Sequence, residues 1–138
     1  MAMVSGLYYV GDLCYVLKNQ WEEVCGITIV KQQCLEGQFV LPSKGVVFAM
    51  YGTAYGDGEY KDTTGRSYCV DSGSIGCIPL SACDMTEEQI REEGLGQVLA
   101  FGERFNTYSD GSTIHFGTVS IDTGYTEEED EDPSPGEY

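Results

Sequence analysis

Positively charged residues are scarce in this chain of 138 residues. Lys and Arg total 7 against 23 Asp and Glu, which gives a formal net charge of −16 at pH 7. Nucleic acids are bound mainly through Lys and Arg contacts to phosphates, and anionic membrane surfaces attract the same side chains. The composition therefore predicts no nucleic acid and no membrane as partner, and it favours a protein partner, with a basic protein as one option.

Long hydrophobic segments are also missing. The longest uncharged apolar run, residues 46–51, is far shorter than the ~20 residues that span a membrane. The first residues lack a basic segment, and Gly6, Gly11 and Asp12 interrupt their apolar stretch, so we expect no secretory signal. The expected location is the cytoplasm, where the six cysteines would stay reduced and pack as small apolar side chains.

Common catalytic and metal-binding motifs are absent as well. The chain has no Cys-x-x-Cys pair, no phosphate-binding loop, no Gly-x-Ser-x-Gly and no His-Glu-x-x-His. Two catalytic candidates remain. The single histidine, His115, would be required for a Cys–His nucleophile pair. Asp71 would contribute to an acidic pocket if the fold brought it near Asp12 and Asp57.

The abundant acid is concentrated towards the C-terminus. Residues 123–138 contain no Lys or Arg, whereas the other 122 residues hold 16 acids and all 7 bases, a net charge of −9. The seven acids of this segment are Glu127, Glu128, Glu129, Asp130, Glu131, Asp132 and Glu137. Like charges at this density repel one another and stay solvated, which predicts one folded domain over residues 1–122 and a disordered acidic tail over 123–138. The tail would be a solubilising extension or an arm that docks on a basic partner.

Turn residues between short apolar runs predict about seven short strands in hairpins. The predicted pairs are residues 38–41 with 46–51, 59–61 with 67–70, and 97–105 with 113–121. Residues 7–17 would form two extended pieces around a turn at Gly11-Asp12, and residues 74–80 a further strand.

Capping residues predict two short helices. Asn19 with Glu22 predicts a helix from about residue 20 into the low 30s, with a strand as the alternative for its β-branched second half. Thr86 with Gln89 predicts a helix over residues 87–93 that ends at Gly94. The fold class is therefore α+β and β-rich, with a mainly antiparallel sheet.

The most unusual loop reads Tyr-Gly-Asp-Gly-Glu-Tyr at residues 55–60. One interpretation is a plain turn in which the Asp caps its own backbone. Another is a Ca²⁺ or Mg²⁺ site, because Asp57, Glu59 and Asp62 supply three carboxylates within six residues. A third is a partner-contact rim made of Tyr55, Asp57, Glu59 and Tyr60, although packing alone explains much of the tyrosine content.

Three motifs together resemble a known set of proteins. Tyr-Val-Gly-Asp-Leu-Cys-Tyr-Val stands at residues 9–16, Thr-Ala-Tyr-Gly-Asp-Gly-Glu-Tyr at 53–60 and Asp-Gly-Ser-Thr-Ile-His-Phe-Gly at 110–117. The chain resembles small uncharacterised proteins of phages, large DNA viruses and bacteria that carry Gly-Asp-x-Cys-Tyr and Tyr-Gly-Asp-Gly-x-Tyr. The resemblance implies a compact β-rich fold and a viral or bacterial source, and it implies no activity.

These observations lead to three functional hypotheses. The first is a small acidic interaction protein of viral or phage origin, not an enzyme, that binds a protein partner in the host cytoplasm through acidic, Tyr-rich loops. The second is a divalent-metal-dependent hydrolase that uses Asp57, Glu59 and Asp71. The third is a structural component of a virion.

Overall fold

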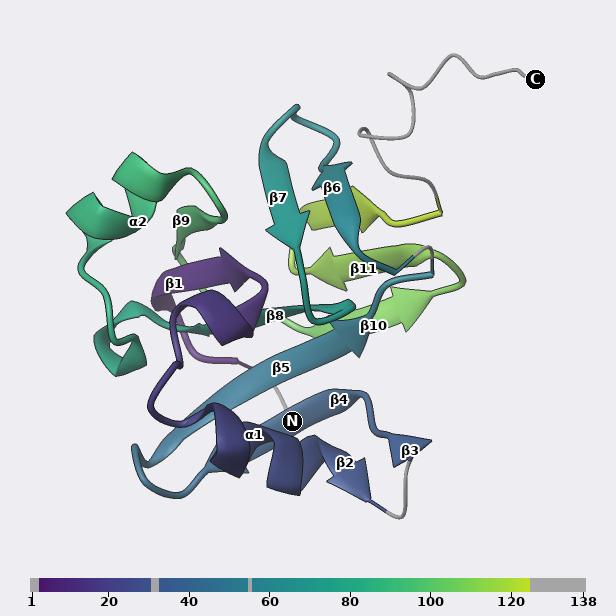
Figure 1. The fold of residues 1–138 in the computed structure, drawn as a ribbon. Helices are drawn as coiled ribbons and strands as arrows, with labels where there is room; N and C mark the ends of the chain where they lie inside the picture. Colours follow the sequence, from purple (N-terminus) through teal and green to yellow (C-terminus); the bar gives the residue numbers. More distant parts are fainter. Residues whose placement is uncertain (1–2, 31–32, 55, 125–138) are drawn as a thin grey trace.

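The computed structural model describes residues 3–30, 33–54 and 56–124. Its main sheet is antiparallel throughout, with the strand order β4-β5-β8-β1-β9. These strands are β1 (Gly6–Gly11), β4 (Gly37–Leu41), β5 (Val46–Gly52), β8 (Ser74–Pro79) and β9 (Gln97–Phe101). The central strand β8 pairs with β1 and β5, so strands distant in the sequence lie side by side (Figure 1).

A second layer of strands packs on one face of the main sheet (Figure 1). It combines the hairpin of β6 (Gly58–Lys61) and β7 (Ser67–Val70) with the three-stranded sheet of β10 (Thr107–Asp110), β11 (Thr113–Phe116) and β12 (Val119–Asp122). The two parts are joined where Asp62 pairs with Ile121 and the Thr63 amide donates to the Ser120 carbonyl at 3.1 Å.

Helical segments pack against the other face of the main sheet. They are α1 (Trp21–Thr28), α2 (Glu87–Glu93) and the 3₁₀ turns η1 (Leu13–Tyr15) and η2 (Leu80–Ala82). A small hairpin of β2 (Ile29–Val30) and β3 (Gln33–Cys34) follows α1. No helix in the described residues is both long and apolar enough to cross a membrane.

The main sheet is buried on both faces because its strands alternate between two apolar cores. On β5, Ala49 and Tyr51 face the second strand layer, whereas Phe48 and Met50 face the helices. The first core is unusually aromatic. Its aromatic side chains are Tyr8, Tyr51, Tyr60, Tyr68, Phe105 and Phe116, with Phe101 packed against them. These tyrosines are therefore packing residues, which is the interpretation that the sequence favoured.

The predicted β-rich α+β class is confirmed, and so are the elements with strong local signals. The hairpins β4–β5 and β6–β7 form in the predicted pairs. Helix α2 has the full capping box of Thr86 and Gln89, and Gly94 ends the helix in the left-handed conformation at φ 67°.

Three local predictions were wrong. Residues 13–15 form η1 instead of a second extended piece, because the Asp12 carboxylate caps the turn by accepting from the Cys14 amide. Helix α1 begins at Trp21 without a side-chain cap from Asn19 and ends at Thr28, so the predicted cap and length are wrong, while the alternative of a strand is confirmed at Ile29–Val30. The third error concerns β9, which pairs with β1 at the edge of the main sheet instead of forming a hairpin with residues 113–121.

The last hairpin is instead made by β10 and β11, and a turn at Gly117 (φ 62°) separates β11 from β12. The fold also extends past residue 122. Thr123 is fully buried, its amide donates to the Ser112 carbonyl at 2.8 Å, and its hydroxyl accepts from the Ala54 amide at 2.9 Å. Thr123 therefore belongs to the domain and not to the predicted tail. The seven acids of the tail lie outside the described residues.

Candidate functional site

Five loops meet at one end of the molecule, where β5 and β12 end and β10 turns into β11 (Figure 1). They comprise residues 35–37, 52–58, 71–74, 110–113 and 122–124, residue 55 excepted. Backbone hydrogen bonds connect these loops. The Gly52 amide donates to Glu36 Oε2 at 2.9 Å, and the Thr53 amide donates to the Gly73 carbonyl at 3.0 Å. The contacts of Thr123 with Ala54 and Ser112 tie in the remaining two loops.

Asp12 holds the base of this end together. Its carboxylate is fully buried. Oδ2 accepts from the amides of Asp71 at 2.7 Å and Ser72 at 2.6 Å, and Oδ1 accepts from the Ser72 hydroxyl at 2.8 Å and the Cys14 amide at 3.0 Å. The Gly-Asp-x-Cys segment and the Asp-Ser-Gly segment are therefore two halves of one hydrogen-bonded structure. Asp12 is accordingly a structural residue.

The other acids of this end are exposed residues. The exposed acids are Glu36, Asp57, Asp71, Asp110 and Asp122, and none of the five loops contains a Lys or Arg. We call these five residues, with the loops that carry them, the acidic end. Asp57 leans over the 71–74 turn, because its Oδ1 lies 4.0 Å from where a Cβ on Gly73 would stand. The structure thus brings Asp12, Asp57 and Asp71 to the same turn, with Asp12 enclosed and the other two exposed.

The predicted contact rim at residues 55–60 is wrong for Tyr60. Tyr60 is 1% exposed and belongs to the aromatic core, and its hydroxyl donates to the Gly56 carbonyl at 2.5 Å. The aromatic ring closes the turn from inside, so a partner has no access to it. Asp57 remains exposed and Glu59 half-buried, whereas Tyr55 lies outside the described residues.

The carboxylate of Asp62, a residue of the predicted metal site, is engaged by donors within the protein. Its buried carboxylate accepts from the amides of Thr64 and Arg66, the Thr64 hydroxyl, the Arg66 guanidinium and the Tyr68 hydroxyl, at 2.7–3.1 Å. Burial alone would raise the pKa of Asp62, but these hydrogen bonds outweigh it and lower the pKa to about 2. Within the part of the chain that the structure describes, no three or more His, Cys, Asp and Glu side chains are grouped to hold a metal ion. The predicted site of Asp57, Glu59 and Asp62 and the hydrolase site of Asp57, Glu59 and Asp71 thus gain no support.

The two catalytic candidates lie in different places. Asp71 is on the turn before β8, whereas His115 is on β11, where its ring stacks on Tyr108 at 4.3 Å and its Nδ1 lies 2.9 Å from Ser120 Oγ. Cys14 is the cysteine of the first motif. Burial and the neighbouring Asp12 raise the pKa of its thiol to about 12, so the thiol is protonated at neutral pH. A protonated thiol at Cys14 gives no support to a Cys–His nucleophile pair at this cysteine.

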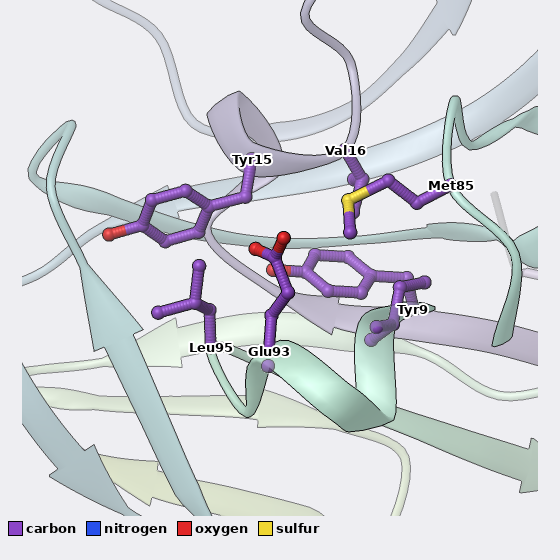
Figure 2. A pocket seen from close by; sticks show the side chains of 8 residues that line it. Tyr9, Tyr15, Val16, Met85, Glu93 and Leu95 are labelled. Carbon is purple, nitrogen blue, oxygen red and sulfur yellow. The ribbon is translucent and has the colours of Figure 1, made fainter. Parts of the chain in front are cut away.

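One cavity of the described residues lies beside α2 and another beside α1. Figure 2 shows the first, beside α2, with the Glu93 carboxylate directed between the rings of Tyr9 and Tyr15. Its volume of about 10 Å³ is enough for one water molecule. The second, at the acidic end, has a volume of about 140 Å³. It lies among residues of α1, β5 and the 71–74 turn: Trp21, Cys25, Thr28, Met50, Tyr51, Ser72, Gly73 and Ser74, with Ile29, Leu35, Glu36 and Gly52 completing the lining.

Sequence reasoning did not find this second cavity. The helical spacing of Trp21, Cys25 and Thr28 was a signal for one face of a helix, but the β5 and 71–74 walls come from distant segments. Comparison of the chain with protein-family models, curated proteins and solved structures gives no match. The resemblance to phage, viral and bacterial proteins stays a prediction.

Proposed function

We propose that this protein is a non-enzymatic interaction protein whose acidic end binds a basic protein partner. The observation that carries the proposal is the convergence of Glu36, Asp57, Asp71, Asp110 and Asp122 on five linked loops without a Lys or Arg. The motif resemblance adds a viral or phage origin to the proposal, with the partner in the host-cell cytoplasm.

The chemistry of this end suits a cationic surface. Exposed carboxylates of one sign sum to a negative potential, which raises the rate at which a positively charged partner is captured. The loops are tied to one another and to the buried Asp12, so little conformational entropy has to be lost on binding. Gly124, the last described residue, lies at this end, and residues 125–138 contain seven further acids.

The test is affinity purification followed by mass spectrometry from the cell in which the protein is produced naturally. The acidic end is altered by Asp57→Lys with Asp71→Lys, both exposed and both without a side-chain hydrogen bond among those described. The matched control is Glu88→Lys with Glu92→Lys, which makes the same change in charge on the exposed surface of α2. A chain ending at Gly124 shows how much the last 14 residues contribute.

We expect the wild type and the α2 variant to retain the same basic protein, and the acidic-end variant to lose it. The retained protein should be released as salt is raised through the physiological range. Equal recovery on all three forms, or recovery of no basic protein on any of them, would contradict the proposal.

A further inference from the structure

The cavity of about 140 Å³ adjoins the acidic end and has a different chemistry. Its lining is mainly apolar and brings Trp21 and Cys25 of α1 beside residues 50–52 of β5. An apolar cavity of about 150 Å³ is large enough to hold a benzene ring. The volume therefore corresponds to one apolar side chain of about the size of Leu or Phe.

The rim of the cavity combines exposed apolar residues with acids. Ile29 is 44% exposed and Leu35 is 40% exposed, and both line the cavity together with Glu36. Asp71 immediately precedes the lining residue Ser72, and none of the lining residues is a Lys or Arg. An apolar recess with a negative rim is complementary to an apolar group that is flanked by positive charges.

The two serines of the cavity wall have their hydrogen-bonding partners within the protein. The Ser72 hydroxyl donates its one hydrogen to Asp12 Oδ1 at 2.8 Å, so in its 3.0 Å contact with Ser74 the Ser74 hydroxyl is the donor. Both hydroxyl hydrogens are thus engaged, and neither serine offers a free donor to a ligand. The wall consequently favours the apolar part of a ligand over a polar one.

We infer that this cavity receives one apolar side chain of the basic partner, with the partner's Lys or Arg residues lying on the carboxylates around it. The inference rests on the proposed function and adds specificity to it. Charge brings the partner to the acidic end, and the apolar side chain buried in the cavity, here called the anchor, determines which segment of the partner binds. Single anchors in desolvated pockets commonly supply much of the affinity of an interface.

Trp21 makes this inference directly measurable, because it is the chain's single tryptophan and lines the cavity. Two short synthetic peptides of Lys and Gly, one with a central Phe and the other with a central Ala, are titrated into the full chain. We expect the Phe peptide to change the Trp21 emission and to bind about tenfold more tightly than the Ala peptide. Equal affinities with an unchanged Trp21 emission would overturn the anchor while leaving charge-driven binding intact.

A rim variant sharpens the comparison. Leu35→Ser removes an exposed apolar side chain from the cavity, whereas Val40→Ser removes one of 52% exposure that does not line it. Leu35→Ser should weaken the Phe peptide severalfold and leave the Ala peptide unchanged, and Val40→Ser should affect neither. An equal effect of both variants on the Phe peptide would contradict the inference.

Small cations separate failure of the anchor from failure of the proposed function. Benzylammonium has an aromatic ring and methylammonium has none, and neither requires a protein-sized partner. If benzylammonium changes the Trp21 emission and methylammonium does not, the cavity is supported as an apolar site. If in addition neither peptide binds, the proposed protein partner is wrong although the cavity binds an apolar group. If the peptides bind through charge alone, with no effect of benzylammonium or of the central Phe, the inference about the cavity is overturned. The proposed function then still stands.

Discussion

Aspartates in this chain have two distinct roles, which burial separates. Asp12 and Asp62 are buried, and both carboxylate oxygens of each accept hydrogen bonds from donors within the protein. Asp57 and Asp71 have the same side chain in Asp-Gly or Asp-Ser turns but face solvent. Asp12 therefore holds loops together from inside and Asp57 and Asp71 would meet a partner, whereas the exposed Glu36 can do both because it also accepts from the Gly52 amide at 2.9 Å.

Replacing Asp12 should be among the most destabilising changes at the acidic end. Asp12→Ala leaves the amides of Asp71 and Ser72 without their acceptor in a buried site, and each such loss costs about 1–3 kcal/mol. We expect the free energy of unfolding to fall by about 3 kcal/mol or more in denaturant titrations followed by circular dichroism.

The matched control for Asp12 is Asp71→Ala, an exposed position whose amide still reaches Asp12. It should change the unfolding free energy by less than about 0.5 kcal/mol. Asp12→Asn keeps one carbonyl acceptor and should fall between the two. Similar losses for Asp12→Ala and Asp71→Ala would contradict the structural role of Asp12.

Asp62 makes stability depend on pH in a defined direction. Its pKa is about 2 in the folded state against 3.8 in the unfolded chain, so its contribution is complete above about pH 4 and is lost as pH falls towards 2. We expect the wild type to lose about 1–2 kcal/mol more than Asp62→Asn between pH 5 and pH 2, because the amide cannot titrate. Parallel pH curves for the two proteins would show that Asp62 is not held ionised by its donors.

At the scale of the elements, close packing between the main sheet and η1 limits what the sequence tolerates. A Cβ on Gly76 of β8 would lie 2.6 Å from the Ala49 carbonyl oxygen and 2.7 Å from Leu13 Cγ. Only a residue without a side chain therefore allows β8 to pack this closely against both atoms. Gly26 of α1 is the opposite case, because a Cβ there would meet no atom within 4 Å.

The two glycines should consequently respond to alanine with opposite signs. Gly76→Ala should lower the free energy of unfolding by at least about 2 kcal/mol through overpacking. Gly26→Ala should raise it by about 0.5–1 kcal/mol, because alanine loses less backbone entropy in a helix. Thermal and denaturant unfolding measure both effects, and a stabilising Gly76→Ala would refute the packing of β8 described above.

Elements were predictable where their signals are local. The Thr86–Gln89 capping box and the turns of β4–β5 and β6–β7 are specified by a few adjacent residues, and all three form as expected. The pairing of β9 with β1 depends on burial between two layers, which adjacent residues do not specify. Residues 13–15 turn helical because Asp12 caps them, an effect that competes with their strand propensity.

At the scale of the whole molecule, the three layers place five loops from distant parts of the sequence at one end. The sequence indicates Asp57 and Asp71 as turn residues, and the structure shows both exposed. It does not indicate that Asp12 joins the 71–74 turn, that Tyr60 is buried, or that α1 and β5 enclose a cavity beside the acids. Each of these facts depends on contacts between segments that are far apart in the chain.

The most direct measurement of the central claim is amide chemical-shift mapping of the full chain with a basic peptide. Binding at the acidic end predicts shifts that concentrate in residues 35–37, 52–54, 56–58, 71–74, 110–113 and 122–124 and that disappear with Asp57→Lys and Asp71→Lys. The amide chemical shifts of α2, which carries exposed acids of its own, should not change. Shifts centred on α2, or spread evenly over every exposed acid, would contradict the account.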